Sequence, residues 1–202
     1  MTATGNTRVI GIIGPPCSGK STVARQIESM GGVWLDADKI AKEQLTRSDV
    51  IDALVREFGA GVLLDDGTLS REKIADLVFG SSDESKARLK TLESIVHPRT
   101  RQEIRTALQA AREHHAEYVI LDVPLLLESG WQSDCDEVWC LSVPPDRHHA
   151  LLAARGWDRD ELKRREKRQL PWGEKRRRSD WVIENDGSIE ELTKKVRDRL
   201  GR

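Results

Sequence analysis

The 202-residue sequence predicts an α/β fold, a five-stranded parallel sheet that is doubly wound by helices. Three observations predict it. Five short apolar runs, each typical of a buried strand, alternate with segments that carry apolar residues at helical spacing. A glycine-bounded loop joins the first apolar run to the first helical segment. Polar residues follow several of the runs, at the carboxyl ends of parallel strands, where such sheets bind ligands.

The loop is Gly14-Pro15-Pro16-Cys17-Ser18-Gly19-Lys20-Ser21, which fits the phosphate-binding pattern G-x-x-x-x-G-K-[ST]. It follows the apolar run 9–13 and precedes the amphipathic segment 21–27. A strand, loop and helix in this order aim backbone N–H groups and a helix N-terminus at phosphate oxygens. We expect Lys20 on the β- and γ-phosphates and the Ser21 hydroxyl on Mg²⁺. The alternative is a glycine-rich turn with a solvated lysine, but the strand–helix context favours a nucleoside triphosphate site.

The segment 46–116 is predicted to be a helical insertion, because no strand pattern occurs in it. The residues before it give a second strand and a helix, at 33–35 and 39–45. Within the insertion, apolar spacing predicts helical turns at 49–58, a helix capped by Ser70 and a longer helical tract from Asp83, and we expect His97-Pro98 to break or bend that tract.

After residue 116 the strands resume, at 118–122, 138–143 and 181–183. A helix is predicted from Pro144-Pro145-Asp146 to about Arg155, and a charged helix over 158–168. We expect Pro171-Trp172-Gly173 to break the latter. Ser188 and Glu191 form a capping box for the closing helix.

Composition and motifs predict a soluble cytoplasmic protein. Hydrophobic residues make up 38% of the chain and charged residues 33%, as in globular proteins. No apolar run is long enough to cross a bilayer, and the first eight residues lack the apolar centre of a signal peptide. The three cysteines, an odd number in no metal-site spacing, favour a reducing compartment. His114-His115 and His148-His149 have no metal spacing either, and we expect them on the surface.

The formal net charge of −1 conceals a basic block. Residues 155–178 carry eleven Lys and Arg against five Asp and Glu. Such a block is typical of a nucleic-acid surface or of a flap that closes over phosphates. Guanidinium groups in a flap neutralise charge on a transferred phosphoryl group. The candidates for that role are Arg155, Arg164, Arg165 and Arg168.

Five residues at the carboxyl ends of four predicted strands are candidates for one site: Gly14, Asp36, Asp38, Asp122 and Asn185. A carboxylate such as Asp38 suits the base that orients an acceptor hydroxyl, although Asp36 or Asp38 can equally cap the next helix. Asp122, at the end of an apolar strand, suits a ligand of Mg²⁺ or a turn former.

The chain resembles one family over nearly its whole length, the dephospho-CoA kinases. The segments that carry the resemblance are the loop Gly14 to Thr22, Asp36-Ala37-Asp38-Lys39-Ile40-Ala41, Asp66-Gly67 with Leu69-Ser70-Arg71, Leu92 to Pro98, Leu121-Asp122-Val123-Pro124-Leu125-Leu126-Leu127-Glu128, Gln169-Leu170-Pro171 with Glu174-Lys175, and Asp180 to Gly187. The loop pattern occurs in many nucleotide-binding proteins, whereas the other segments in this order are far more specific.

The chain departs from the family pattern at two places. The family's G-G-I-G-S-G-K loop carries Pro15-Pro16-Cys17 here, and its Q-x-x-R-L-x-x-R helix has His148 and Leu151 at the first and fourth positions.

The resemblance implies ATP-dependent phosphorylation of the ribose 3′-hydroxyl of dephospho-CoA, the last step of coenzyme A biosynthesis. It implies ATP and dephospho-CoA as partners, Mg²⁺ as cofactor, and neither nucleic acid nor membrane. The implied residues are Asp38, Lys20 and Arg155 for catalysis; Gly14, Cys17, Ser18, Gly19, Lys20, Ser21, Thr22 and Asn185 for ATP; Asp38, His97 and Arg101 for the acceptor; and Ser21 and Asp122 for the metal.

A single P-loop kinase domain is the organisation that the resemblance implies. Its core spans about residues 8–45, 117–145 and 173–202, with a CoA-binding insertion at about 46–116 and a lid at about 146–172. Two other hypotheses compete with it, a nucleoside-monophosphate-type kinase and a nucleic-acid-binding ATPase that uses the basic block.

Overall fold

The computed structural model describes residues 7–156 and 169–202, which form two compact units. One unit comprises the described residues up to 36 and from 108 onward, and the other comprises residues 37–107. The predicted helix 158–168, with Arg164, Arg165 and Arg168, lies outside the described residues.

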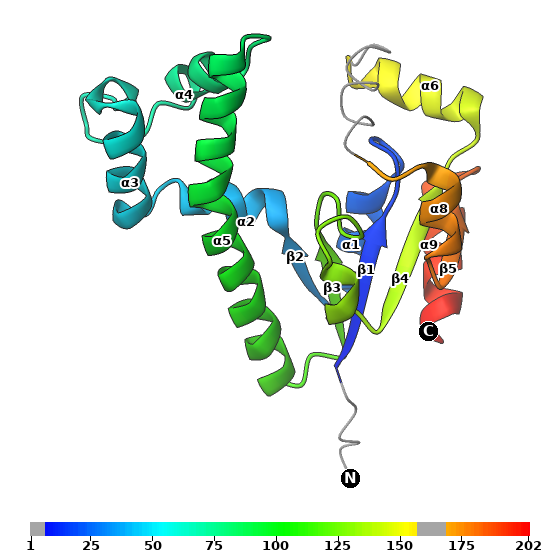
Figure 1. Ribbon diagram of the computed structural model, residues 1–202. Helices are drawn as coiled ribbons and strands as arrows, with labels where there is room; N and C mark the ends of the chain where they lie inside the picture. Colours follow the sequence, from blue (N-terminus) through cyan, green and yellow to red (C-terminus); the bar gives the residue numbers. More distant parts are fainter. Residues whose placement is uncertain (1–6, 157–168) are drawn as a thin grey trace. The chain divides into compact units, whose positions relative to one another are not determined.

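The first unit is built on a five-stranded, all-parallel sheet in the order β2-β3-β1-β4-β5 (Figure 1). This confirms the predicted fold class. Parallel pairing needs a long crossover between consecutive strands, which the intervening helices supply. The strands are β1 (Arg8–Ile13), β2 (Val33–Asp36), β3 (Tyr118–Asp122), β4 (Glu137–Ser142) and β5 (Trp181–Glu184).

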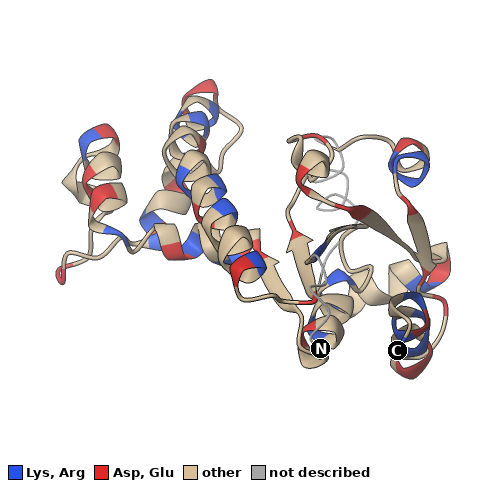
Figure 2. Cartoon of the chain, turned by 90° about the horizontal axis from the view of Figure 1, so that it is seen from below, with Lys and Arg blue, Asp and Glu red and all other residues tan. Residues whose placement is uncertain are grey.

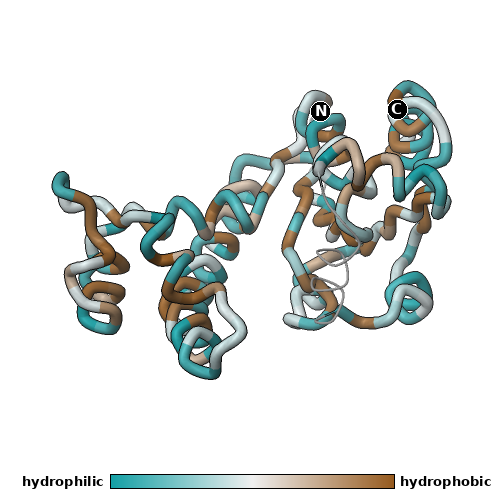
Figure 3. Tube along the Cα trace, turned by 90° about the horizontal axis from the view of Figure 1, so that it is seen from above, coloured by the Kyte–Doolittle hydropathy of each residue, from teal (hydrophilic) through white to brown (hydrophobic). Residues whose placement is uncertain are grey.

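The core of this unit lies between the sheet and two helices, α1 (Lys20–Ser29) and α9 (Ile189–Leu200). Most residues of the central strands β1, β3 and β4 are buried and hydrophobic. Figure 3 colours the hydrophobic residues of the chain brown. Trp139 and Trp181 of neighbouring strands meet edge to face, with 4.8 Å between ring centroids. Each buried aliphatic side chain contributes about 1.5–3 kcal/mol to stability. The sheet is therefore a rigid base for the loops at its carboxyl edge.

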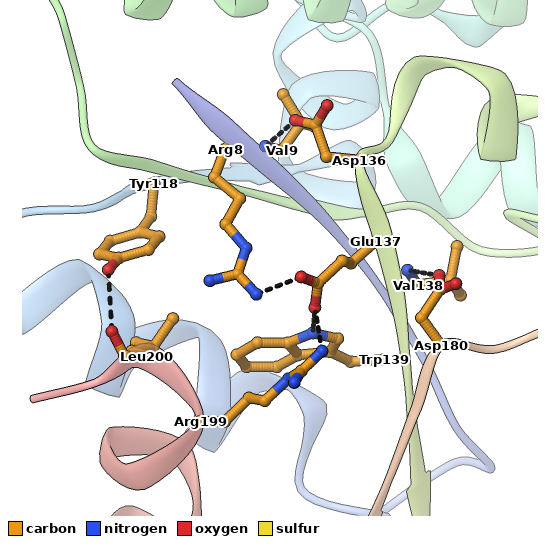
Figure 4. A network of polar contacts seen from close by, with 10 residues as sticks. All are labelled: Arg8, Val9, Tyr118, Asp136, Glu137, Val138, Trp139, Asp180, Arg199 and Leu200. Carbon is orange, nitrogen blue, oxygen red and sulfur yellow. Dashed lines mark hydrogen bonds and ion pairs between the residues drawn. The ribbon is translucent and has the colours of Figure 1, made fainter. Parts of the chain in front are cut away.

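Hydrogen bonds and ion pairs connect the strands at the amino ends of β1 and β4 (Figure 4). The loop between β1 and α1 lies at the opposite, carboxyl edge of the sheet. Glu137 accepts from Trp139 Nε1 at 2.8 Å and pairs with Arg8 and Arg199. Burial alone would raise the pKa of Glu137, but these bonds outweigh it and hold the pKa below its ordinary value. Asp136 accepts from Val9 N–H at 2.7 Å. These contacts secure the ends of β1 and β4.

Short helices complete the first unit. They are α6 (Pro145–Ala154), α8 (Trp172–Arg177) and the 3₁₀ segment η2 (Trp131–Asp134). The predicted capping box of α9 is confirmed, because Ser188 Oγ accepts from Glu191 N–H and Ser188 N–H donates to Glu191. Pro171 has an extended backbone and forms the N-cap of α8. The charged helix that Pro171-Trp172-Gly173 was expected to break lies outside the described residues.

The second unit is helical and has its own hydrophobic core. It holds α2 (Ala37–Gln44), α3 (Ser48–Phe58), η1 (Ala60–Val62), α4 (Arg71–Val78) and most of α5 (Asp83–Glu113). Ser70 caps α4 as predicted, since its hydroxyl accepts from Lys73 N–H at 3.3 Å. Figure 2 shows Lys and Arg interspersed with Asp and Glu along α5, as expected of a solvated helix face. Val50, Leu54 and Val96 lie in the core.

We expected His97-Pro98 to break or bend the helical tract, and the structure shows that a break is wrong. Pro98 lies inside the continuous helix α5. A proline removes one backbone donor and crowds the carbonyl one turn earlier. Here side chains donate to neighbouring carbonyls: Arg99 to that of Ile95 at 2.9 Å, and Thr100 to that of Val96 at 2.9 Å. These bonds add side-chain donors to the turn around Pro98, and Val96 of the same turn is buried in the core.

Candidate active site

The loop between β1 and α1 needs both of its glycines. Gly19 has a φ of 99°, a left-handed conformation in which other residues are strained. A Cβ atom there would lie 2.8 Å from Asn185 Nδ2. A Cβ on Gly14 would lie 2.5 Å from Ser18 Oγ and 3.1 Å from Leu141. Gly19 is therefore required by its backbone conformation, and Gly14 by the close approach of neighbouring atoms.

Donors from several elements bind the carbonyl oxygens of this loop. Lys20 Nζ donates to the carbonyls of Gly14 and Pro15, at 3.0 and 3.1 Å. The buried Asn185 amide donates to the Ser18 carbonyl at 2.8 Å. Since a carbonyl that faced a phosphate would repel it, these bonds suit an anion site. In the first turn of α1, the N–H groups of Thr22 and Val23 donate to the Gly19 carbonyl, each at 3.0 Å. The N–H groups of Lys20 and Ser21 come before these bonds, at the start of the helix, where a bound anion can accept from them.

His148 of α6 also contributes, contrary to the expectation that it lies on the surface. It is half-buried, and its Nε2 lies 2.7 Å from the Pro16 carbonyl oxygen. No sequence motif indicated this contact. The signal in the sequence was the departure itself, a histidine where the family pattern has glutamine.

The electrostatic surroundings of Lys20 bring further residues together. Burial lowers the pKa of the Lys20 ammonium, and the charge of Asp122 opposes this effect. Lys175 and Arg155 are also near enough to lower the pKa. Asp122 ends β3, directly across from Asp36 at the end of β2. The predicted strand-end carboxylate thus lies at the carboxyl edge of the sheet, close to the loop lysine.

Ser21 and Asp122 suit a magnesium ion that is held mainly by phosphate and water. Ser21 is exposed in the first turn of α1, and Asp122 is half-buried. Both offer hard oxygen ligands, and Mg²⁺ usually takes only one or two protein ligands at nucleotide sites. Over residues 7–156 and 169–202, no group of three His, Cys, Asp or Glu side chains forms a ready metal cage.

Arg155 follows the last turn of α6 and is exposed. Its Nη1 lies 3.8 Å from Cys17 Sγ, and the next residue, Gly156, has a left-handed φ of 70°. The structure therefore places the predicted lid arginine beside the loop.

A buried ion pair was missed by the sequence analysis. Lys175 Nζ of α8 lies 3.0 Å from Glu128 Oε1, and the two side chains are 5% and 16% exposed. Glu128 also accepts from Leu170 N–H at 2.7 Å, and Lys175 donates to Gln169 at 3.0 Å. This cluster joins the segment after β3 to the residues just before α8.

The second unit carries the other predicted residues. Asp38 is exposed in the first turn of α2, two residues after the end of β2. His97 and Arg101 lie one turn apart on α5, exposed and half-buried respectively, so they share a helix face. In the described part of the chain, no helix is both long and apolar enough to span a membrane.

Comparison with known proteins identifies close relatives of this chain. The model of the dephospho-CoA kinase family matches residues 8–191. A protein of Rhodopirellula baltica named dephospho-CoA kinase is 55% identical over 195 residues, which cover 96% of this chain and 90% of that protein. One of Symbiobacterium thermophilum with the same name is 40% identical, over 94% of this chain and 78% of that protein.

Solved structures share the fold. A crystal structure from Thermus thermophilus superposes with a TM-score of 0.76 at 36% identity and covers 97% of both chains. A dephospho-CoA kinase from Campylobacter jejuni has a TM-score of 0.70 at 21% identity and covers 98% of this chain and 97% of its own; it supports the fold alone.

Proposed function

The chain belongs to the dephospho-CoA kinase family, and we propose from this premise the roles of its residues in transferring the γ-phosphoryl group of ATP to the ribose 3′-hydroxyl of dephospho-CoA. This reaction is the last step of coenzyme A biosynthesis. The observation that carries the proposal is the loop between β1 and α1, whose carbonyl oxygens accept hydrogen bonds from Lys20, Asn185 and His148. The family model matches residues 8–191, which include this loop.

In the proposed reaction, the 3′-oxygen forms a bond to the γ-phosphorus as the bond from that phosphorus to the β,γ-bridging oxygen breaks. The transition state is loose, so catalysis consists mainly of positioning and electrostatic stabilisation. Lys20 and the loop N–H groups bind the β- and γ-phosphates. Ser21 and Asp122 would hold Mg²⁺, which neutralises phosphate charge when bound. Asp38 accepts the proton of the attacking hydroxyl.

The helical segment 46–116 is proposed to bind the acceptor, with His97 and Arg101 among the contacts. Residues 146–172 are proposed to act as a lid. The three cysteines of the chain are free thiols, which supports a reducing, cytoplasmic location. The basic block is assigned to phosphates and not to nucleic acid, because Arg155 and Lys175 both lie near Lys20.

A coupled ADP-release assay tests the function. Dephospho-CoA, AMP, shikimate and no acceptor are compared at saturating MgATP. We expect saturable turnover with dephospho-CoA alone. Turnover with AMP would instead support a nucleoside-monophosphate kinase. Acceptor-independent hydrolysis stimulated by DNA or RNA in a salt-sensitive way would support the nucleic-acid-binding ATPase.

Replacing Asp38 by asparagine is expected to lower kcat by about a hundredfold or more, the usual effect of losing a positioned general base. The Kd for MgATP should change little, because the carboxylate serves the acceptor. Steady-state kinetics with dephospho-CoA and a direct binding titration with MgATP measure the two effects. An equal loss of ATP binding would show that Asp38 serves the metal or the fold instead.

Replacing Arg155 by alanine is expected to lower kcat more than it weakens ATP binding, because an arginine aimed at transition-state charge acts mainly on turnover. Arg177→Ala, an exposed residue of α8 from the same basic block, is the matched control. Both variants are compared in kcat and in KM for ATP. Equal and mild losses in the two would mean that only the general charge of the block matters.

A further inference from the structure

Two departures from the family pattern meet in the structure. One is Pro15-Pro16-Cys17 in the loop, and the other is His148 at the first position of the helix motif. They lie far apart in the sequence, yet His148 Nε2 is 2.7 Å from the Pro16 carbonyl oxygen. A carbonyl oxygen only accepts hydrogen bonds, so Nε2 must carry the proton. The His148 ring is therefore a donor to the tip of the loop.

The prolines change which donors the loop has. Pro15 and Pro16 carry no N–H, so the first backbone donor that the loop retains after Gly14 is that of Cys17. The next one, Ser18 N–H, is already used within the loop, because it donates to the Pro15 carbonyl at 3.2 Å. The direction of the Cys17 N–H therefore matters more in this chain than in one with the glycine-rich loop.

The peptide unit between Pro16 and Cys17 links the two observations. A trans peptide is planar, and its carbonyl and N–H point in opposite directions. All peptide bonds of the described chain are trans. A donor that fixes the Pro16 carbonyl on the side of α6 therefore also fixes the Cys17 N–H on the opposite side.

Cys17 is also held in an uncommon conformation. Its φ is 60°, in the left-handed region, at the position where the family pattern has glycine. A side chain other than glycine costs about 1–2 kcal/mol there and persists where the surroundings impose it. The hydrogen bonds on both sides of Cys17, from His148 to Pro16 and from Asn185 to Ser18, impose it.

We propose that His148 is a positioning residue for nucleotide binding, which acts by holding the Pro16–Cys17 peptide so that the Cys17 N–H is directed at a phosphate of ATP. This inference rests on the proposed function of the loop. The bond is made in the ground state and the transition state alike, so it should affect ATP affinity and not the chemical step. Without it, only a fraction of molecules would have a loop that is competent to bind.

The test compares two substitutions of His148 with one of its exposed neighbour. His148→Leu keeps an apolar side chain of moderate size and removes the donor, whereas His148→Gln restores a donor. Loss of one hydrogen bond predicts about a 3- to 10-fold higher KM for ATP in His148→Leu. The KM for dephospho-CoA and kcat should stay within about twofold. His148→Gln and the control His149→Leu should resemble the wild type.

A packing role predicts a different pattern. If His148 only filled space on α6, leucine would be tolerated and glutamine would offer no advantage. An unchanged KM for ATP in His148→Leu, or an equal rise in His149→Leu, would overturn the proposal. A His148→Gln variant whose KM for ATP rises as much as that of His148→Leu would also overturn the proposal.

A spectroscopic measurement separates this inference from the proposed function. Long-range ¹H–¹⁵N spectra of the full chain at about pH 9, where an ordinary imidazole is neutral, report which ring nitrogen is protonated. We expect the proton of His148 on Nε2, with the signal assigned by its loss in His148→Gln. A proton on Nδ1 would exclude the contact. If the wild type failed to phosphorylate dephospho-CoA while the Nε2 proton was present, the proposed function would fail and the contact would stand.

Discussion

Replacing Lys20 by alanine is expected to abolish phosphoryl transfer and to leave the fold intact. The ammonium group lies in the loop, where it donates to the carbonyls of Gly14 and Pro15. It is the cation proposed to meet the β- and γ-phosphates. Its loss removes charge stabilisation from the transition state and also frees two carbonyls to face the phosphates. A decrease in kcat of about a thousandfold or more is the scale expected for such a group.

The fold should tolerate this change because Lys20 stabilises the loop and not the core. Burial lowers the pKa of Lys20, which indicates that the buried charge is unfavourable in the protein without ligand. Thermal unfolding followed by circular dichroism should therefore give a Tm close to that of the wild type. Lys194→Ala, an exposed lysine of α9, is the control for activity. Near-wild-type turnover in Lys20→Ala would refute the assignment of the phosphate loop.

Replacing Lys175 by methionine is expected to lower the free energy of unfolding by about 3–5 kcal/mol, the usual cost of removing one partner of a buried ion pair. Methionine keeps the length and removes the charge. Glu128 would then be left buried without its counter-ion. Its pKa is now below the ordinary value, because hydrogen bonds from Leu170 N–H and Lys175 outweigh the rise that burial alone would cause.

Urea unfolding at about pH 7 measures this loss. Arg176→Met is the matched control, since Arg176 lies on the same helix and pairs with Glu184 at 3.4 Å, with both side chains about half exposed. An exposed pair is worth about 0–1 kcal/mol, so this variant should be nearly neutral. The double variant Lys175→Met with Glu128→Gln should recover part of the loss, because no unpaired charge is then buried. Equal effects of Lys175→Met and Arg176→Met would contradict a buried pair.

The pair also has a defined pH dependence. Because the pKa of Glu128 is lowered in the folded protein, its charged form adds to the free energy of unfolding at pH values above the pKa that Glu128 has in the unfolded chain. This contribution is lost as the pH falls through the folded pKa. The difference in stability between wild type and Lys175→Met should therefore be larger near neutral pH than in acid.

Sequence reasoning identified the sheet and the strand-end residues because their signals are local. The apolar runs predict strands, and parallel pairing then brings their carboxyl ends to one edge, as with Asp36 and Asp122. The loop pattern likewise fixes the order of strand, loop and helix. For the same reason the capping box at Ser188 was predicted correctly.

The features that were missed depend on partners far away in the sequence. Lys175 belongs to a run of four basic residues, and only contact with Glu128 distinguishes it from its exposed neighbours. His148 looks like a surface histidine until α6 brings it to Pro16. Pro98 was expected to break or bend the helix, and a break is wrong. The side chains of Arg99 and Thr100 donate to carbonyls one turn earlier, and a local pattern does not reveal such bonds.

The position of β1 in the sheet has a consequence for synthesis of the chain. β1 is the central strand and is made first, yet its two partners come from residues 118–122 and 137–142. The contiguous helical unit 37–107 is complete before either partner has been translated. Long-range parallel pairing of this kind folds slowly and leaves apolar strands exposed to aggregation in the meantime. A nascent chain that stalls before residue 137 would therefore present one open edge of its most hydrophobic strand to the chaperones around it.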